Sequence, residues 1–396
     1  MDPRQTHQPT AEADRAASLG RLAHVYPIDA RRTPAGGLEI GGCDAVSLAR
    51  EFGTPAYVYA EDDIRSRARA YADAFAARSE RFEIVYGSKA FPCTAVNRVL
   101  AEEGLSCDVA SAGELYLALR GGFAPERIYM HGNNKTGAEI EYALERGVGH
   151  VVVDSFDEIE RLERIVAERG TTQRVMLRVT PGISPSTHSF IQTGQVDSKF
   201  GFAMDDVPRA IERAAASGRL ELRGLHAHIG SQVFDLEPYE RLAELLAGIG
   251  DYPLLGVGGG LGIAYTEEDV APSIEDYAEA VLRGAPAGVT VLSEPGRSLV
   301  GNAGVTLYTV GTVKEVPGVR TYVAVDGGMS DNLRPMLYGA RYEAELADRA
   351  GGETLCTIAG MHCESGDILI SGVAIDDPRP GDVLVVAGDR RSRRRG

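Results

Sequence analysis

The stretch HVVVDSFDEIERLERIVAERG, residues 150–170, contains a strand followed directly by a helix. Its opening, HVVVDS (150–155), is a short run rich in valine, which indicates a buried strand. From residue 155 onward the apolar residues recur at helical spacing, and Gly170 is the residue type that commonly follows a helix. One such unit is a building block of α/β folds, so its recurrence decides the architecture.

The same kind of unit recurs over residues 56–296. Amphipathic segments separate the strand candidates, and Gly, Pro, Asn or Asp bounds each of them. Eight units predict an α/β fold, a (β/α)8 TIM barrel, although periodicity alone leaves a doubly wound open sheet as a rival. The other seven strand candidates are EIVYGSK (83–89), LSCDVAS (105–111), RIYMHG (127–132), RVMLRVT (174–180), LRGLHAHIG (222–230), LLGVGGG (254–260) and VTVLSEPG (289–296).

The pattern changes after residue 297, where apolar and polar residues alternate with period two between turn residues. This alternation predicts a second, mostly antiparallel β-domain, a barrel or a sandwich. The N-terminal GLEIGG (37–42) is expected to pair with it. The strand candidates are GVTLYTVGTVKEV (304–316), RTYVAVDGG (320–328), ETLCTIAG (353–360), DILISGVAI (367–375) and DVLVVA (382–387).

These patterns predict the domain boundaries. Residues 55–297 form the barrel, and residues 20–54 together with 298–387 form the β-domain. Residues 1–19 are polar and Ala-rich, and we expect them to be disordered. Residues 388–396 form an atypical Arg-rich tail.

Composition narrows the class of protein. The formal net charge of −16 argues against a nucleic-acid partner. The five cysteines are scattered without a CxxC pair, which predicts neither a zinc site nor a disulfide framework. The sequence has neither an apolar run that could span a membrane nor a secretory signal. A cytoplasmic enzyme without a metal and without a membrane partner is therefore expected.

Polar and titratable residues gather at the ends of the predicted strands, which in a barrel is the face that carries the chemistry. A lone lysine at a strand end is ordinarily a surface residue, so Lys89 by itself decides nothing. The whole set is more specific than any one member. It contains Lys89, Asp108, Ser111, His131, Asn133, Arg178, His228, Ser231, Gly258, Gly259, Gly260, Glu294 and Arg297.

Three of these features together predict a pyridoxal 5′-phosphate (PLP) site. The glycine run VGGGLG (257–262), with Ser231 one strand earlier and SEPGR (293–297) one strand later, is typical of a phosphate cradle. Lys89 can form a Schiff base with the aldehyde. Glu294 can keep the pyridine nitrogen protonated, which makes the ring an electron sink.

Six motifs, in order along residues 20–386, resemble those of the diaminopimelate decarboxylases. These are fold type III PLP-dependent enzymes, related to the ornithine and arginine decarboxylases. The resemblance implies an alanine racemase-like barrel with a C-terminal β-barrel or sandwich. The motifs are YGSKAFP (86–92), HAHIGSQ (226–232), GVGGGLGIAY (256–265), SEPGRSLVGNAG (293–304), VDGGMSDNLRPMLYGARY (325–342) and HCESGD (362–367).

The resemblance implies roles for the residues around the cofactor. Lys89 carries PLP as a Schiff base, and His228 stacks on the pyridine ring. Glu294 contacts the ring nitrogen, and Arg297 serves the phosphate or a substrate carboxylate. The remaining cofactor-binding residues are Asp108 and, for the phosphate, Ser231, Gly258, Gly259 and Gly260.

It also implies roles on the substrate side. Arg334 and Tyr338 hold the distal amino-acid end, with Glu364 near its ammonium. Cys363 reaches into the neighbouring subunit's site of a head-to-tail homodimer and protonates the carbanion. A free cysteine is more commonly a buried thiol, so this role depends on the resemblance. TGQVDSKFG (193–201) is expected to shape the substrate side of the barrel.

The implied activity is the decarboxylation of meso-2,6-diaminopimelate to L-lysine and CO2. The planar guanidinium of Arg334 suits a distal carboxylate, whereas a decarboxylase of ornithine needs acidic groups there. Two alternatives stay open: another basic or carboxylated amino acid as the substrate, or a truncated non-catalytic PLP-binding paralogue.

The C-terminus departs from the family pattern. After RPGD the family continues into a turn with a tyrosine that meets the cofactor or the substrate, whereas this chain reads VLVVAGDRRSRRRG (383–396). A shifted reading frame and a truncation explain the change equally well. Either predicts impaired activity and an unpaired edge strand in the β-domain.

Overall fold

The computed structural model describes residues 11–183 and 198–388. The chain divides into two compact units, which we describe separately. Of the described residues, the barrel unit comprises those within 64–263 and 271–299, and the β-unit comprises those up to Asp63, Ala264–Val270 and those from Val300 to Gly388. Within the described residues no helix combines the length and the apolar character needed to cross a membrane.

Eight parallel strands form the closed barrel, and each coincides with a predicted strand. The ring closes because β13 pairs with β5 and β8 pairs with β9, which rules out the open doubly wound sheet. A short strand, β10 (Phe202–Ala203), adds to β9. The barrel strands are β5 (Phe82–Gly87), β6 (Ser106–Val109), β7 (Ile128–Met130), β8 (His150–Val153), β9 (Gln173–Thr180), β11 (Leu220–His226), β12 (Leu254–Gly256) and β13 (Thr290–Ser293).

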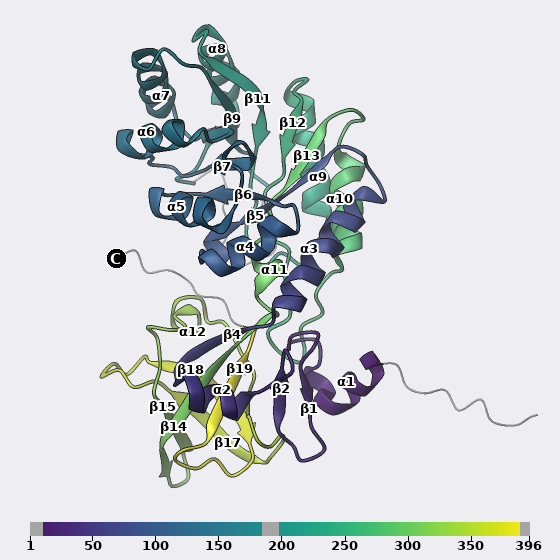
Figure 1. Cartoon of the computed structure of the whole chain (residues 1–396), viewed down its shortest axis with the longest axis vertical. Coiled ribbons are helices and arrows are strands. Elements are labelled where there is room, and N and C mark those ends of the chain that lie inside the picture. Colours follow the sequence, from purple (N-terminus) through teal and green to yellow (C-terminus); the bar gives the residue numbers. More distant parts are fainter. Residues whose placement is uncertain (1–10, 184–197, 389–396) are drawn as a thin grey trace, which may run out of the picture. The chain divides into compact units, whose positions relative to one another are not determined.

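Helices cover the outside of these strands (Figure 1). Helix α7 shows why: Ser155 caps its N-terminus by accepting a hydrogen bond from the Glu158 amide, and a buried apolar stripe that includes Ile159 and Leu162 faces inward. Gly170 follows its end at φ +68°, as predicted. The helices are α3 (Glu61–Ala76), α4 (Thr94–Glu102), α5 (Ala112–Gly121), α6 (Gly137–Arg146), α7 (Phe156–Glu168), α8 (Val207–Ala216), α9 (Glu237–Ile249), α10 (Ile274–Gly284) and α11 (Arg297–Val300).

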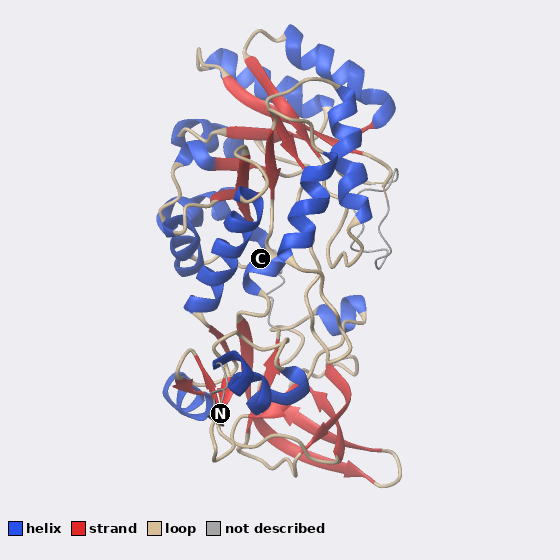
Figure 2. Cartoon of the chain, turned by 90° about the vertical axis from the view of Figure 1, so that its right-hand side faces the viewer, coloured by secondary structure: helices blue, strands red, loops and turns tan. Residues whose placement is uncertain are grey.

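The β-unit contains the predicted second sheet, whose long strands Figure 2 shows in red. Its order is β16-β19-β14-β15-β17-β18, with β4 also on β14, and every pairing is antiparallel except β15 with β17. The second unit is therefore mostly antiparallel, as predicted. Its strands are β4 (Ala56–Tyr59), β14 (Gly304–Val316), β15 (Arg320–Val325), β16 (Ala344–Leu346), β17 (Thr354–Ala359), β18 (Ile368–Ile375) and β19 (Val383–Ala387).

Two N-terminal strands differ from the sequence-based expectation. GLEIGG contributes β2 (Leu38–Ile40), which pairs with β1 (Arg31–Arg32) and β3 (Cys43–Asp44) in a separate three-stranded sheet. The strand that joins the C-terminal sheet is instead β4, which pairs antiparallel with β14. The residues after 55 therefore begin in the β-unit rather than in the barrel.

The expectation for residues 1–19 also changes. Residues 11–19 form helix α1 (Ala11–Leu19) rather than a disordered tail, because Leu19 packs into a core cluster and the Arg15 guanidinium donates to the Pro27 carbonyl at 2.9 Å. Strand β19 pairs with β14 and with β16, and the strands at the two ends of this sheet are β16 and β18. The tail residues 1–10 and 389–396, and residues 193–197 of the TGQVDSKFG motif, lie outside the described residues.

Candidate active site

The predicted cofactor residues lie at one rim of the barrel unit, because the carboxyl ends of parallel strands meet at the same edge. Lys89 follows β5 in a 3-10 turn, Ser88–Ala90, and its side chain is exposed. Asp108 lies near the end of β6, and Glu294 directly follows β13. His228 and Ser231 follow β11, and the glycine run follows β12.

Lys89 lies in a charged setting between two neighbouring strand ends. The Ser88 amide donates to Oδ1 of Asp108 at 3.0 Å, which fixes the turn that presents the lysine. Burial raises the pKa of Asp108 to about 6, while the His131 and Lys89 charges act to lower it. Burial also lowers the pKa of His228 well below its usual value, and the Lys89 charge adds to this effect. The Lys89 ammonium therefore acts on both Asp108 and His228.

The glycine run needs glycine at each position. A Cβ atom on Gly259 would lie 1.9 Å from the Glu294 carbonyl oxygen, and one on Gly260 would lie 2.2 Å from the Gly230 carbonyl oxygen. Gly258 has φ +66°, and its Cβ would lie 2.7 Å from Nδ1 of His228. The backbone thus passes too close to its neighbours for any side chain, which leaves a bare peptide surface at the rim.

His228 is oriented by this run. The Gly259 amide donates to Nδ1 of His228 over 3.3 Å, so Nδ1 is the unprotonated nitrogen of the ring. Because the pKa of His228 is lowered, the imidazole is neutral and carries its proton on Nε2. A neutral, half-buried ring suits stacking on another aromatic ring.

Ser231 and Arg297 form the second part of the cradle. Nη2 of Arg297 donates to Oγ of Ser231 at 2.8 Å, and Nε lies at 3.3 Å from the same oxygen. Because the serine oxygen accepts these bonds, its own hydroxyl proton is available for an anion. A guanidinium and a hydroxyl beside bare backbone are the donor set that phosphate groups require.

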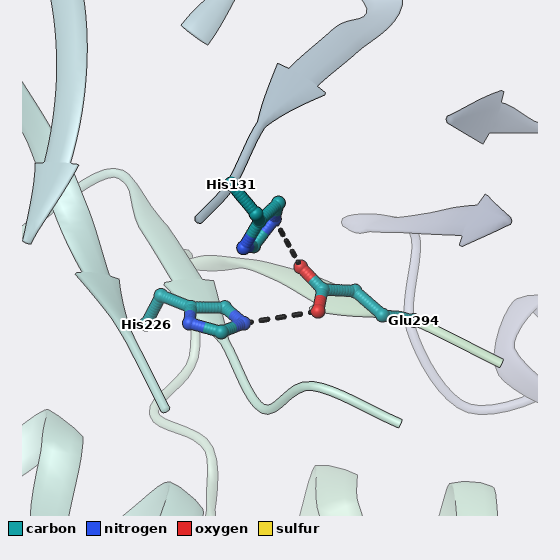
Figure 3. A group of neighbouring side chains, drawn as sticks. All are labelled: His131, His226 and Glu294. Atoms are coloured by element: carbon teal, nitrogen blue, oxygen red, sulfur yellow. Dashed lines mark hydrogen bonds and ion pairs between the residues drawn. The ribbon is translucent and has the colours of Figure 1, made fainter. Parts of the chain in front are cut away.

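Glu294 is held by two histidines (Figure 3). Nε2 of His226 lies 2.9 Å from Oε2 of Glu294, and Nε2 of His131 lies 3.3 Å from Oε1. All three residues are buried: His226 is 1% exposed, His131 7% and Glu294 8%. Burial alone raises the pKa of Glu294, but the two histidines outweigh it and hold the pKa well below the usual value. Glu294 is therefore ionised.

Sequence reasoning placed His131 at the rim but missed His226. The motif HAHIGSQ contained the signal. Side chains of a strand alternate between its faces, so residues 226 and 228, which are two apart, are expected on the same face. His226 is the last residue of β11, and its ring contacts the His131 ring edge-on, with centroids 4.7 Å apart. Both imidazoles lie beside the Glu294 carboxylate.

The same three residues have the spacing of a metal site, since one ligand atom from each lies within 4.8 Å of the others. The 2.9 Å contact between His226 and Glu294 is, however, a direct N–H···O hydrogen bond. An ion would have to replace that bond. We interpret the group as a cluster at the barrel rim built on the His226–Glu294 hydrogen bond, and the absence of a metal stays a prediction of the sequence.

The buried ion pair between Lys135 and Glu158 was also not predicted from the sequence. Nζ of Lys135 lies 2.6 Å from Oε1 of Glu158, and these side chains are only 1% and 2% exposed. The ammonium also donates to the carbonyls of Gly132 and Val152, both at 2.7 Å. Since lysine is normally exposed, nothing in the sequence marked Lys135 as a core residue.

The predicted substrate residues lie in the β-unit. Arg334 is the first residue of helix α12 (Arg334–Tyr338), is 8% exposed and donates from Nη1 to the Tyr342 hydroxyl at 2.5 Å. Its guanidinium lies 4.4 Å from the centre of the Tyr265 ring. Tyr338 ends the same helix and is half-buried.

Cys363 and Glu364 are exposed in the loop between β17 and β18. Asp367, only 2% exposed, ties this loop down by accepting from the amides of Met329 and His362 at 2.6 and 2.9 Å. The motifs HCESGD and VDGGMSDNLRP are therefore one structural piece. The roles of the four β-unit residues, Cys363, Glu364, Arg334 and Tyr338, stay predictions.

PLP fits the barrel rim. The cradle of Gly258, Gly259 and Gly260 has no room for side chains, and the Ser231–Arg297 pair supplies donors for a phosphate. The carboxylate of Glu294 has about four lone-pair positions, of which the His226 imidazole uses one, while His131 lies beside the second oxygen. A ring N–H can therefore still donate to it. The fold and the site define a PLP-dependent enzyme built on a (β/α)8 barrel.

Comparison with known proteins gives the same class. Residues 61–301 match the family described as "Pyridoxal-dependent decarboxylase, pyridoxal binding domain". The diaminopimelate decarboxylase of Bacillus subtilis is 46% identical over 377 residues, which cover 90% of this chain and 86% of that protein. The chain therefore belongs to the diaminopimelate decarboxylases, within the fold type III PLP-dependent decarboxylases.

Solved structures agree with this assignment. The crystal structure of the M. jannaschii diaminopimelate decarboxylase in co-complex with L-lysine superposes with a TM-score of 0.84 at 32% identity, covering 91% of this chain and 87% of that chain. The Helicobacter pylori enzyme complexed with L-lysine gives 0.82 at 32% identity, covering 86% and 87% respectively. The barrel and β-domain architecture is thus shared along most of both chains.

Proposed function

We propose that this protein decarboxylates meso-2,6-diaminopimelate to L-lysine and CO2, the last step of lysine biosynthesis. The observation that supports this most strongly is the 46% identity to a diaminopimelate decarboxylase over 90% of the chain. The barrel rim retains the lysine, glycine cradle, serine, arginine and glutamate that the chemistry needs.

When bound, PLP supplies an electron sink that accepts the electrons released as the bond to the carboxylate breaks. Nζ of Lys89 would hold the cofactor through its aldehyde. Glu294, kept ionised by two histidines, holds a proton on the ring nitrogen. His228 offers its neutral ring for stacking, and Asp108 fixes the turn that carries Lys89.

On the substrate side, Arg334 binds the distal carboxylate. Its guanidinium is planar and suits bidentate recognition of a carboxylate, and the flanking rings of Tyr265 and Tyr342 fix its plane. Burial tends to lower the pKa of Arg334, but the neighbouring tyrosines raise it, so the charge is secure. Tyr338 and Glu364 complete recognition of the distal amino-acid end, and Glu364 faces its ammonium.

Cys363 is the proposed proton donor to the carbon that loses CO2, acting in the site of a partner subunit. A head-to-tail homodimer makes each site depend on both chains. Mixing Lys89→Ala chains with Cys363→Ala chains tests this, because one site of each heterodimer then keeps both residues. Activity restored in proportion to the heterodimers seen by mass spectrometry is expected. Heterodimers as inactive as both parents would assign Cys363 to its own chain or to no role.

Two further expectations stay predictions: a cytoplasmic location, and impaired activity caused by the Arg-rich C-terminus. The second is tested by comparing kcat of the chain with kcat of a version that ends in a family-like segment with its tyrosine. A higher kcat in the extended version would support the prediction that the Arg-rich C-terminus impairs activity. Equal kcat values would contradict it.

The decisive experiment for the function is a substrate panel. Purified protein with PLP should release CO2 and lysine from meso-diaminopimelate, with no comparable release from ornithine, arginine or lysine. Release of CO2 from another amino acid, and none from meso-diaminopimelate, would assign a different substrate to the protein. An absorbance band of lysine-bound PLP without CO2 release from any substrate would indicate the non-catalytic paralogue instead.

A further inference from the structure

The cluster of His131, His226 and Glu294 connects three strands that are not neighbours in the barrel. His131 follows β7, His226 ends β11 and Glu294 follows β13. In the order of the sheet β12 lies between β11 and β13, and β5 and β6 lie between β13 and β7. The three side chains therefore meet across the barrel interior (Figure 3).

A glycine on the intervening strand makes this meeting possible. Gly256 is the register partner of His226 on one side and of Leu292 on the other. A Cβ atom on Gly256 would lie 2.9 Å from Cδ2 of His226 and 3.3 Å from Cε of Met176. Any side chain at residue 256 would push the imidazole away from Glu294, so the glycine serves the hydrogen bond as well as the strand.

The tautomer of His226 follows from its surroundings. Nε2 lies 2.9 Å from a carboxylate oxygen, whereas the buried Nδ1 has no hydrogen-bond partner among the described residues. A proton on Nδ1 would be a buried donor left without an acceptor, and a carboxylate needs a donor at Nε2. His226 therefore carries its proton on Nε2 and donates it to Glu294.

We propose that His226 and His131 are positioning residues that hold Glu294 ionised and in one rotamer for the cofactor's ring nitrogen. His226 donates a hydrogen bond to one carboxylate oxygen, and Nε2 of His131 lies 3.3 Å from the other, so both oxygens have an imidazole neighbour. Without these donors a buried carboxylate takes up a proton and rotates, and a protonated acid cannot keep a ring nitrogen protonated. We call the hold of His226 and His131 on Glu294 the clamp. Its effect on kcat rests on the proposed function, but the existence of the clamp does not.

Two variants of His226 separate its hydrogen bond from its volume. His226→Leu fills a similar space and removes the donor, and we expect kcat to fall about tenfold to hundredfold, with little change in KM. His226→Gln keeps an amide N–H at similar reach, and we expect it to recover most of kcat. His131→Leu should act in the same direction. His150→Phe, which changes another buried histidine on β8, should keep kcat within about twofold.

A double variant tests whether the effect passes through Glu294. If His226 acts only by holding this carboxylate, His226→Leu should cause no further loss of kcat in a Glu294→Gln background. Independent losses that multiply in the double variant would overturn the proposal. Retention of wild-type kcat by His226→Leu, with its folding verified by thermal melting, would also overturn it.

A readout without cofactor or substrate keeps the clamp testable even if the proposed activity fails. The chain has eight histidines, few enough for selective 15N-histidine NMR of the PLP-free protein with assignment by substitution. We expect His226 as the Nε2–H tautomer, with its Nε2 proton signal shifted or lost in Glu294→Gln. A signal of the Nδ1–H tautomer for His226 would refute the clamp, because Nε2 could then not donate.

Discussion

Nη2 of Arg297 lies 2.8 Å from Oγ of Ser231, which joins the helix after β13 to the turn after β11. This hydrogen bond holds the guanidinium and the hydroxyl, two donors suited to a phosphate, in a fixed relation to each other. Preorganisation of this kind lowers the cost of binding.

Ser231→Ala should therefore weaken PLP binding. Losing a hydrogen bond to a charged group costs about 1.5–3 kcal/mol, which is roughly a tenfold to hundredfold rise in the PLP dissociation constant. Fluorescence titration of the PLP-free protein measures this constant. Ser298→Ala is the matched control, because the Ser298 hydroxyl bonds to the buried Tyr71 at 2.6 Å instead. Equal PLP affinity in Ser231→Ala and wild type would contradict the phosphate role.

Arg334→Lys should raise KM for diaminopimelate about tenfold or more while leaving the PLP dissociation constant unchanged. Lysine keeps the charge but lacks the planar fork that matches a carboxylate. Initial-rate kinetics with a parallel PLP titration separates the two effects. An unchanged KM would assign the distal carboxylate to another residue.

Lys135→Met should destabilise the barrel by about 3–5 kcal/mol, because it leaves the Glu158 carboxylate buried and unpaired. Denaturant unfolding followed by circular dichroism measures the loss. The double variant Lys135→Met with Glu158→Leu removes both charges and should recover much of the stability. A double variant that is as unstable as the sum of the two single variants would show that the charges do not depend on each other.

His150→Phe should remove part of the acid sensitivity of the fold. Burial lowers the pKa of His150 from 6.5 to about 4, and the charges of Arg174 and Arg223 add to this. Between these pH values the unfolded chain binds the proton and the folded chain does not. Stability is therefore complete above pH 6.5 and falls toward pH 4, by at most about 1.4 kcal/mol per pH unit.

Phenylalanine does not titrate and can keep the stack on Tyr129, whose ring lies 4.7 Å from that of His150 at an angle of 6°. The unfolding free energy of His150→Phe minus that of wild type should rise as the pH falls from 6.5 to about 4. Parallel curves would show that His150 is not the titrating group.

The eight barrel strands were predictable because each is a short apolar run, and several of the helices between them carry a capping side chain or a terminal glycine. Ser155 and Gly170 around α7 are examples. The pairing of GLEIGG was not, since its short β2 carries no signal that selects β1 and β3 over the C-terminal sheet. Helix α1 was missed for a related reason. Its order comes from tertiary contacts such as Arg15 with Pro27, not from its composition.

The candidate site divides in the same way. The position of Lys89, Glu294 and the glycines at the strand ends could be predicted, because these residues directly follow recognisable strands. His226 and Lys135 could not be assigned as readily, because their importance depends on side chains from distant strands and helices. Lys135 can be buried because Glu158 and two backbone carbonyls bind its ammonium. The sequence alone does not show that these groups lie together.

Lys89 at the barrel rim is expected to carry PLP and so to make this protein a decarboxylase of diaminopimelate. The most direct test measures CO2 and lysine released from meso-diaminopimelate by wild type and by Lys89→Ala, both supplied with PLP. We expect equimolar CO2 and lysine from wild type. For Lys89→Ala we expect loss of turnover together with loss of the absorbance of lysine-bound PLP, while the circular dichroism spectrum is unchanged. Turnover by Lys89→Ala at the wild-type rate would contradict the account.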